Sequence, residues 1–207
     1  MGWCNRRVGL QCRGRGADNT DAMIEDFPTT LRAAQVGDEW AVAVLWQELN
    51  HRLVRFLRSR NREAAEDIAS ETWLTVATKL DQFEGEEVEF RAWLFTIARS
   101  RLIDWQRRAQ RRPQSAVDPE GFAERVASDD PAADALEALD TDASLAMIYR
   151  LPADQGEVIL LRVLAGLDVA RVSGIVGKRP GTVRMLQLRG LRRLQELLGS
   201  PTARIRM

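Results

Sequence analysis

The chain is poor in the residue types on which metal sites and many enzymes depend. Its 207 residues include one histidine, His51, and two cysteines, Cys4 and Cys12, with no histidine beside the cysteines. A single histidine argues against a histidine-based triad, and this cysteine usage predicts neither a zinc site nor a structural disulfide. A Gly-rich phosphate loop of the Walker type is also missing. We therefore expect no cofactor, no bound metal and no small-molecule substrate.

Long hydrophobic runs are missing as well. No stretch of about 18 apolar residues occurs, so the sequence predicts no membrane-spanning helix. Residues 1–20 carry four arginines but no apolar segment of the kind found in a secretory signal, and the expected location is the cytoplasm. We interpret residues 1–24 as a disordered tail, with Met23 as a candidate start of translation. The apolar content of 45% suffices for two small helical cores but is thin for one large domain with a deep catalytic cleft.

The formal net charge is zero, but the charges are separated along the chain. Residues 113–142 hold nine acidic residues and one arginine, a net charge of −8. Residues 145–207 hold eleven basic and four acidic residues, a net charge of +7. The acidic stretch is too poor in apolar residues to fold alone and predicts a solvated linker. The small basic segment that follows is typical of a domain that binds a polyanion.

Apolar residues at helical spacing predict several helices before the linker. A turn at Gly37 precedes Asp38, which is a favourable cap for the next helix. The buried stripe expected on that helix consists of Val42, Leu45, Leu49, Leu53 and Phe56. Two more helices are expected over residues 63–80 and 90–111, with Arg91 and most of the other arginines of the last helix away from its apolar face. A loop with four glutamates separates these two helices at residues 81–89.

Turn residues divide the C-terminal segment into three helices. Pro152 precedes the first helix and Gly166 ends it. Asp168 caps the second helix, Gly177 ends it, and Pro180 lies in the first turn of the third. Three helices separated by tight turns, of which the last is basic, are typical of a helix-turn-helix unit.

The third of these helices has two chemically distinct faces at 100° per residue. The inner arc consists of Val183, Gln187, Gly190, Leu191, Leu194 and Leu198. The outer arc consists of Gly181, Arg184, Met185, Leu188, Arg189 and Arg192. Guanidinium groups suit guanine edges or phosphates, and apolar side chains suit thymine methyl groups. A solvated arginine-rich face is the ordinary alternative, but the helix-turn-helix setting favours DNA binding.

Three stretches of the sequence resemble the extracytoplasmic-function (ECF) sigma factors of bacterial RNA polymerase. The C-terminal segment resembles their σ4 domain over LPADQGEVILLRVLAGLDVARVSGIVGKRPGTVRMLQLRGLRRL, with GTVR…R…L as the most characteristic part. In the N-terminal half, the segment of the σ2 domain that docks on the polymerase clamp helices is matched by EDIASETWLTVATKL. The segment that captures the −10 element is matched by FRAWLFTIARSRLIDWQRR. The resemblance covers about four-fifths of the chain, and its motifs follow the family's order.

This resemblance implies an all-α protein made of two small helical domains. They are a σ2-like four-helix domain at residues 25–112 and a σ4-like helix-turn-helix domain at residues 145–207, joined by a flexible acidic linker at residues 113–144. The implied function is that of an alternative sigma factor, which is not an enzyme and directs core polymerase to specific promoters. The implied partners are core RNA polymerase, through its β′ clamp helices and β flap, promoter DNA and an anti-sigma factor.

The resemblance also assigns roles to individual residues. Recognition of the −35 element falls to Lys178, Arg179, Thr182, Arg184, Met185, Leu188, Arg189 and Arg192. Capture of the −10 element falls to Arg99, Arg101, Trp105, Arg108, Arg111 and Arg112, since aromatic and guanidinium groups suit unstacked bases and a backbone. Docking on the polymerase falls to Asp67, Ser70 and Glu71. From the residues alone, Trp105 is equally well explained as core, and the carboxylates of Asp67 and Glu71 are better explained as ordinary surface charge.

Four features depart from the family pattern. Arg179 replaces a frequent Ser or Thr cap, Arg171 stands where a Glu is usual, and Gln187 falls at an apolar position. The acidic loop at residues 81–89 occupies the family's place for the segment that holds a flipped −10 base, although glutamates repel phosphates. These departures bear on the particular promoter sequence rather than on the fold.

Two other functional classes compete with a sigma factor. One is a stand-alone helix-turn-helix regulator whose N-terminal half senses a ligand or dimerises. The other is a helical adaptor without a DNA role, which leaves the arc of Arg184, Arg189 and Arg192 unexplained. Dependence on polymerase separates the first class from a sigma factor, since a stand-alone regulator binds its palindromic operator as a dimer.

Overall fold

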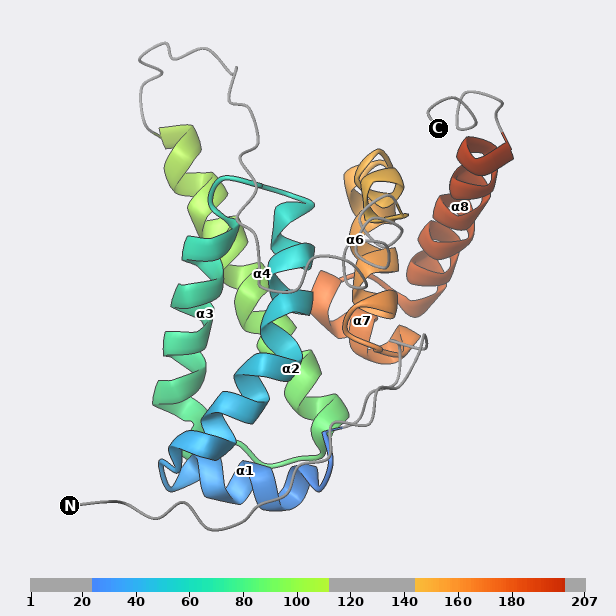
Figure 1. Cartoon of the computed structure of the whole chain (residues 1–207). Helices are drawn as coiled ribbons and strands as arrows, with labels where there is room; N and C mark the ends of the chain where they lie inside the picture. The colour runs from blue at the N-terminus through green and yellow to red at the C-terminus, as the bar shows by residue number, and fades with distance from the viewer. Residues whose placement is uncertain (1–23, 112–143, 200–207) are drawn as a thin grey trace, which may run out of the picture.

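The computed structural model describes residues 24–111 and 144–199, and every regular element in these ranges is helical (Figure 1). The N-terminal part contains α1 (Phe27–Gln35), α2 (Glu39–Arg58), α3 (Ala65–Lys79), a 3₁₀ turn η1 (Leu80–Gln82) and α4 (Glu87–Arg111). The C-terminal part contains α6 (Ala153–Val163), α7 (Val169–Val176) and α8 (Pro180–Gly199), after a short helical stretch at residues 144–149. The predicted all-α architecture is confirmed. The expected tail up to residue 23, Arg112 and the acidic linker up to residue 143 lie outside the described residues.

Helices α1 to α4 pack around an aromatic core. Phe56 of α2 meets Phe95 of α4 edge to face, with ring centroids 5.4 Å apart. The first turn of α4 contributes Phe90, which is fully buried and lies 5.7 Å from the ring of Phe27 and 5.3 Å from that of Phe83. Buried aromatic residues of this kind typically stabilise a domain by about 3–5 kcal/mol relative to alanine. The core therefore fixes the orientation of α4 against the rest of the N-terminal part.

Three expectations for the N-terminal part are wrong in detail. Val42 is 41% exposed, and the inner position is taken by Ala41, one helical turn before Leu45. Asp38 occupies the N-cap position of α2, but its side chain makes no capping hydrogen bond within the described residues. Arg91 is buried, because its neighbour Glu87 is buried as well and brings a carboxylate oxygen to 3.7 Å from Arg91 Nε.

The turn chemistry of the C-terminal part is confirmed. Asp168 caps α7, where its Oδ1 accepts a hydrogen bond of 2.8 Å from the backbone N–H of Arg171. Gly177 ends the helix with φ of 66°, a left-handed conformation that glycine adopts without a steric penalty. Pro180 is the first residue of α8. The helix-turn-helix arrangement of α7 and α8 is therefore built as the sequence predicts.

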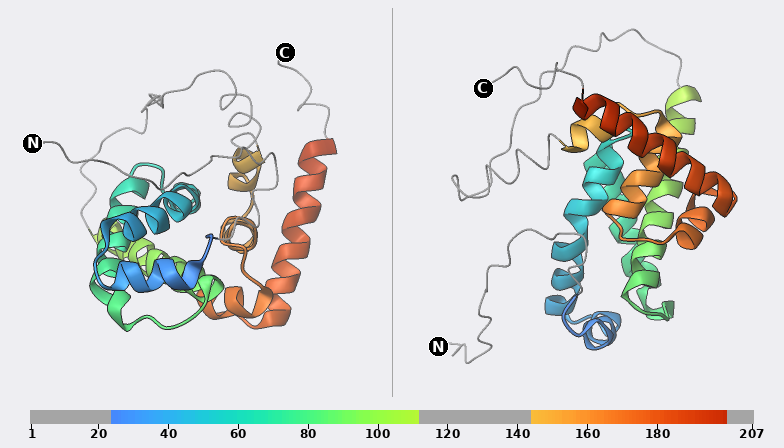
Figure 2. Two further views of the ribbon diagram at one scale, coloured as in Figure 1. Left: turned by 60° about the horizontal axis from the view of Figure 1, so that its bottom comes forward. Right: turned by 90° about the vertical axis from the view of Figure 1, so that its right-hand side faces the viewer.

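The crossing of α8 over α6 places a glycine against Ile159. A Cβ atom at Gly190 would lie 2.5 Å from Cδ1 of Ile159, so a larger residue requires the Ile159 side chain to move. The right-hand view of Figure 2 shows α8 crossing in front of α6. Burial on α8 ends at this crossing, and the predicted inner residues Leu191 and Leu198 are 44% and 60% exposed. The inner arc is therefore buried only in the first half of the helix.

The two parts of the chain contact each other. Helix α7 lies against α4, and α6 lies against α2 (Figure 1). The hydroxyl of Tyr149 donates a hydrogen bond of 2.9 Å to the backbone carbonyl of Arg55 across this contact. Among the described helices, none combines the length and the apolar character needed to cross a membrane.

Candidate nucleic-acid and polymerase interfaces

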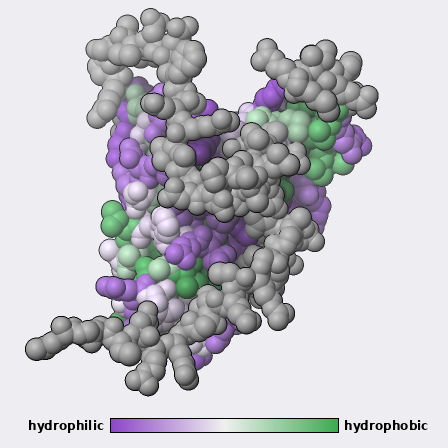
Figure 3. Space-filling model, viewed as in Figure 1, coloured by the Kyte–Doolittle hydropathy of each residue, from purple (hydrophilic) through white to green (hydrophobic). Residues whose placement is uncertain are grey.

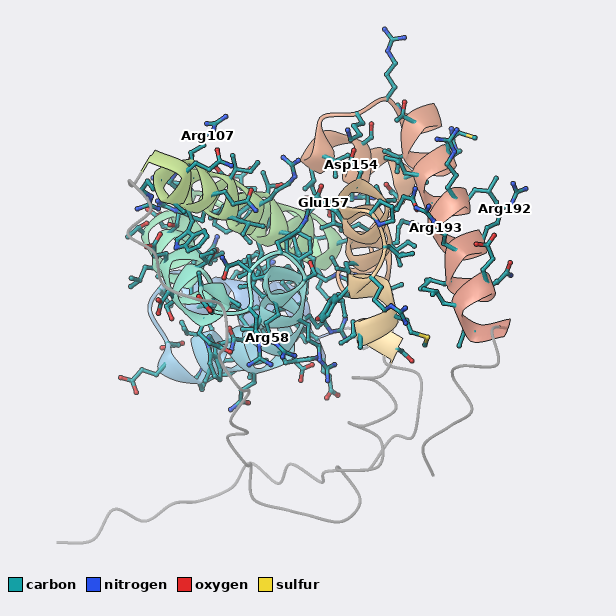
Figure 4. The ribbon with its side chains drawn as sticks, turned by 90° about the horizontal axis from the view of Figure 1, so that it is seen from above. Arg58, Arg107, Asp154, Glu157, Arg192 and Arg193 are labelled. Atoms are coloured by element: carbon teal, nitrogen blue, oxygen red, sulfur yellow. The ribbon has the colours of Figure 1, made fainter. Side chains whose placement is uncertain are left out.

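The outer arc of α8 is exposed along its whole length. Its apolar members Met185 and Leu188 are 48% and 44% exposed. Figure 3 shows hydrophobic surface over α8. Within the described residues, Arg184, Arg189 and Arg192 take part in no ion pair. Figure 4 shows Arg192 projecting away from the rest of the molecule. Unpaired guanidinium groups beside exposed apolar side chains are what a helix needs to read a DNA groove.

The turn that leads into α8 is held by its neighbours. The ammonium nitrogen of Lys178 lies 3.2 Å from a carboxylate oxygen of Asp154 on α6. The hydroxyl of Ser173 donates a hydrogen bond to the carbonyl of Lys178. Arg179 and Thr182 are exposed. Lys178 is therefore engaged by a carboxylate in this structure, while Arg179 and Thr182 are accessible to a phosphate.

The residues expected to capture the −10 element do not share one face of α4. Arg101 and Arg108 lie on one side, where Arg101 Nη2 donates a hydrogen bond of 2.9 Å to the hydroxyl of Thr75. Arg99 lies about 200° away at 100° per residue and faces α6. Trp105 is half-buried against the core. The side chain of Arg111 lies outside the described side chains. The structure thus brings together only part of the predicted set.

The exposed surface of α4 forms a stripe that the sequence analysis did not single out. It consists of Thr96, Ser100, Asp104, Arg107 and Arg108. Four of these positions recur every four residues, and since each step turns the side chain by about 40°, the stripe winds over about 120° of the helix surface. The sequence contains this periodicity, but the prediction selected residues by their arginine-rich composition, and those residues are spread around the helix.

The expected polymerase-docking residues lie on an exposed face of α3. Asp67, Ser70 and Glu71 are all accessible, and Ser70 donates its hydroxyl proton to the carbonyl of Glu66. The same face carries Leu74, which is 68% exposed and follows Asp67 and Glu71 at helical spacing. A carboxylate oxygen of Glu71 lies 3.9 Å from Arg108 Nη2, so the α3 face adjoins the exposed stripe of α4.

Comparison with known proteins identifies the family. Residues 45–112 match the family described as Sigma-70 region 2. The chain is 31% identical to the ECF RNA polymerase sigma factor BldN of Streptomyces coelicolor over 188 residues, which cover 90% of this chain and 70% of BldN. It is 30% identical to the ECF RNA polymerase sigma factor SigD of Mycobacterium tuberculosis over 179 residues, which cover 83% of this chain and 84% of SigD. The chain belongs to the ECF sigma factors.

Solved structures agree with this assignment. The fold is similar to that of CnrH in a complex with the cytosolic domain of CnrY, with a TM-score of 0.54, 20% identity and coverage of 82% of this chain and 95% of CnrH. It is also similar to the sigma factor RpoE of Bartonella quintana in a complex with the anti-sigma factor NepR. That match has a TM-score of 0.55 and 30% identity, and it covers 76% of this chain and 98% of RpoE. The identification of the family from sequence motifs is confirmed.

Two departures of this ECF sigma factor from its family meet in one contact. Arg171 of α7 donates a hydrogen bond to Glu89, which was expected in the acidic loop but lies in the first turn of α4, and forms an ion pair with Asp168, the N-cap of α7. The guanidinium of Arg171 lowers the pKa of Glu89 below its ordinary value. Glu87, the first residue of α4, was also expected in the loop; it is buried and accepts a hydrogen bond of 3.0 Å from the backbone N–H of Ile24. Two of the four glutamates at residues 81–89 are therefore in α4 and engaged with protein groups.

The single histidine of this ECF sigma factor has no chemical role that the geometry supports. Burial lowers the pKa of His51, and the positive charges of Arg52 and Arg55 lower it further. Within the described residues, no group of three or more His, Cys, Asp or Glu side chains comes together as a metal site requires. His51 is thus an exposed side chain of α2 with a lowered pKa.

Proposed function

We propose that this sigma factor reads the −35 element with the outer arc of α8. One observation carries the proposal. Arg184, Arg189 and Arg192 have no ion-pair partner among the described residues, and all three are exposed beside Met185. A guanidinium without a protein partner binds a guanine edge or a phosphate without first losing an interaction. Lys178, Arg179, Thr182 and Leu188 complete the proposed −35 surface. Lys178 reaches a phosphate only by leaving Asp154, which costs little for an exposed pair.

The −10 element is assigned to the exposed stripe of α4 together with its neighbours. Arg101, Trp105 and Arg108 remain in this proposal, and Arg111 and Arg112 extend it along the chain. Arg107 joins the set because its side chain is 68% exposed and pairs with Asp104 only at 3.9 Å. Arg99 leaves the set because it faces α6 rather than the stripe.

Core polymerase is assigned to the α3 face formed by Asp67, Ser70, Glu71 and Leu74. Acidic side chains around an exposed leucine suit a basic partner helix with an apolar centre. On this basis the β′ clamp helices contact the σ2-like domain at residues 25–112, and the β flap contacts the σ4-like domain at residues 145–207. The acidic linker at residues 113–144 connects the two domains. Because RpoE of Bartonella quintana is described in a complex with the anti-sigma factor NepR, an anti-sigma factor is proposed as a further partner here.

The proposed role is initiation of transcription without catalysis by the chain itself. Transcription by purified core polymerase on genomic fragments, with and without the full chain, tests this role. We expect discrete promoter-specific transcripts only when both proteins are present. Specific binding to palindromic DNA in the absence of polymerase, without any stimulation of transcription, would instead identify a stand-alone regulator.

A further inference from the structure

The α3–α4 loop, residues 80–86, is tied to α1 by one side chain. The side-chain amide of Gln35, the last residue of α1, donates a hydrogen bond of 3.0 Å to the backbone carbonyl of Leu80 and one of 2.8 Å to that of Phe83. These carbonyls lie 45 and 48 residues away in the sequence. Figure 1 shows the segment between α3 and α4 running along α1 at the bottom of the view. A single amide thus connects the first half of the loop to a different helix.

The second half of the loop is held by α4. The ring of Phe83 stacks on that of Trp93 at 5.1 Å and meets the ring of Phe90 edge to face. Gly85 has φ of 148°, and a Cβ atom there would lie 3.0 Å from Cβ of Glu89 and 3.3 Å from Cζ of Phe83. This backbone conformation and this close approach both favour glycine. The loop is therefore fixed by α1 on one side and by α4 on the other.

The α3–α4 loop lies at one end of the exposed stripe of α4. Trp93, on which Phe83 stacks, precedes the stripe residue Ser100 by seven positions, so the two project within about 20° of each other at 100° per residue. Glu86 precedes Thr96, the first residue of the stripe, by ten positions, which is about 15 Å along the helix axis. DNA that follows the stripe therefore reaches the loop after about four base steps of 3.4 Å.

The charge of the loop makes its orientation important. The exposed side chains of the loop are those of Asp81, Gln82, Glu84 and Glu86. Carboxylates repel phosphates, but they accept hydrogen bonds from the amino groups of cytosine or adenine. An acidic loop beside DNA is therefore favourable when its carboxylates face a base edge and unfavourable when they face the backbone. A loop of this composition needs an anchor that fixes which of the two it meets.

We propose that Gln35 is a positioning residue for −10 recognition, because its amide holds the α3–α4 loop with the loop carboxylates toward a base edge of the −10 element. Gln35 does not touch DNA and acts through the carbonyls of Leu80 and Phe83. A loop that is ordered before binding loses less conformational entropy on the promoter, and it presents the same groups to every sequence. The proposal rests on the proposed function, which places the −10 element along α4.

Gln35→Met tests the anchor, because methionine keeps the length of the side chain and its helix propensity but donates no hydrogen bond. Hydrogen exchange of the full chain, followed on peptides that cover residues 80–86, measures the order of the loop. We expect exchange in the loop to become about tenfold faster, since two hydrogen bonds are lost, while exchange in α8 stays as in the wild type. The matched control Gln47→Met changes an exposed glutamine of α2 and should leave both unchanged.

Promoter selection gives a second readout, which a merely structural role would not move. Transcription by the holoenzyme from a library with a randomised −10 element should show that Gln35→Met loses about tenfold of the base preference at one −10 position. Preferences in a randomised −35 library should stay as in the wild type. A domain that is only destabilised would instead lower transcription from all promoters alike. Gln35→Glu should lose more preference, because a carboxylate repels the two carbonyls, and Phe83→Leu should loosen the same position.

Unchanged exchange of residues 80–86 in Gln35→Met would overturn the anchor. Faster exchange with unchanged −10 preferences would overturn the positioning role, and so would an equal loss of preference at the −10 and −35 elements. Failure of the proposed function looks different, since the wild type itself would then support no promoter-specific transcription. In that case the positioning role is refuted together with the sigma function, whereas the anchor is still decided by hydrogen exchange alone.

Discussion

Helices α4 and α8 both carry exposed arginines proposed to meet promoter DNA, but they present them in different states. On α4, Arg101 donates a hydrogen bond to Thr75, while Arg107 lies near Asp104 and Arg108 lies near Glu71. On α8, the arginines of the outer arc have no ion-pair partner in the described part of the chain. The arginines of α8 are thus free of protein carboxylates in the described part of the chain, whereas those of α4 lie close to acceptors on α3 and on α4 itself.

The different surroundings of the two sets of arginines show that a basic composition does not by itself define a DNA-binding surface. The arginines of α8 need no rearrangement before they contact a phosphate or a base. Those of α4 must first exchange a protein acceptor for a DNA acceptor, so their affinity for DNA depends on the helices that neighbour α4. A partner that contacts α3, such as polymerase, can therefore change the affinity of the α4 face for DNA.

The largest effect is expected where the α3 face meets polymerase. Asp67→Arg together with Glu71→Arg should weaken association with core polymerase roughly a hundredfold, because two attractive charges become repulsive. The same change removes the Glu71 carboxylate near Arg108, so Arg108 of α4 then lacks this partner, as the outer-arc arginines of α8 do. The measurement is retention of core enzyme by the tagged variant, after circular dichroism has verified its helical content. Glu39→Arg with Glu63→Arg, two exposed positions outside the face, is the control. Equal retention by both variants would count against the docking face.

A substitution at the crossing of α8 and α6 tests how firmly α8 is positioned. Gly190→Ala places a methyl group 2.5 Å from Ile159 Cδ1, and such overpacking should lower the free energy of unfolding by about 1–3 kcal/mol. Gly174→Ala is the control, because its methyl group would meet no atom within 4 Å and should stabilise α7 by about 0.5–1 kcal/mol. Denaturant unfolding of both variants measures the difference. A Gly190→Ala variant as stable as the wild type would show that the crossing adapts easily.

Base reading and phosphate contact should separate within the outer arc. Arg184→Ala should change which −35 bases the holoenzyme tolerates, by about 1–3 kcal/mol at one position, and Leu188→Ala should weaken the preference at one thymine. Arg192→Ala should lower activity on all promoters alike, because a phosphate contact carries no sequence information. Transcription from a library with a randomised −35 element distinguishes these outcomes. Identical base preferences in Arg184→Ala and wild type would place the reading element elsewhere.

The acidic linker should affect α8 more than α4. Its net charge of −8 competes with DNA for guanidinium groups, and the arginines of α8 are the ones that lack a protein partner. Replacement of residues 113–142 by a neutral spacer of equal length should therefore raise nonspecific DNA binding several-fold at low salt. Fluorescence anisotropy with a mixed-sequence duplex measures the affinity, and the Arg192→Ala form of the same variant should show a smaller gain. No change on replacement would remove the linker from consideration as a competitor.

The smallest effect is expected from acid. The guanidinium of Arg171 lowers the pKa of Glu89 below its ordinary value, so this ion pair contributes to the contact between α7 and α4 at neutral pH and is lost as the pH falls through the lowered pKa. Asp168 also faces Arg171, and the backbone N–H of Arg171 lowers the pKa of Asp168 as well. The free energy of unfolding should therefore decline as the pH falls through the lowered pKa of Glu89, and less steeply in Glu89→Gln. A decline of equal steepness in both proteins would assign the acid effect to other groups.

Local features of the fold were predictable because they depend on neighbours in the sequence. The cap at Asp168, the left-handed Gly177 and the exposed outer arc of α8 each follow from a few adjacent residues or from helical periodicity. The failures involve partners that are distant in sequence. Arg91 was expected on the surface, but it lies beside Glu87 in a buried polar cluster. Glu87 in turn accepts a hydrogen bond from the backbone of Ile24, which precedes Glu87 by 63 residues. Val42 was expected inside because it fits the apolar periodicity of α2. Periodicity does not show that the neighbouring helices cover Ala41 instead.

The sequence by itself determined the family, the helical architecture and which side of α8 is free, because motif order and periodicity are properties of the linear chain. Only the tertiary structure decided which charges meet. Glu157 joins Arg99 across 58 residues and Arg171 joins Glu89 across 82 residues, and no periodicity links such positions. The physical reason is that charge pairs form wherever packing of the apolar faces brings side chains within a few ångströms. The packing of whole helices therefore sets the state of each arginine.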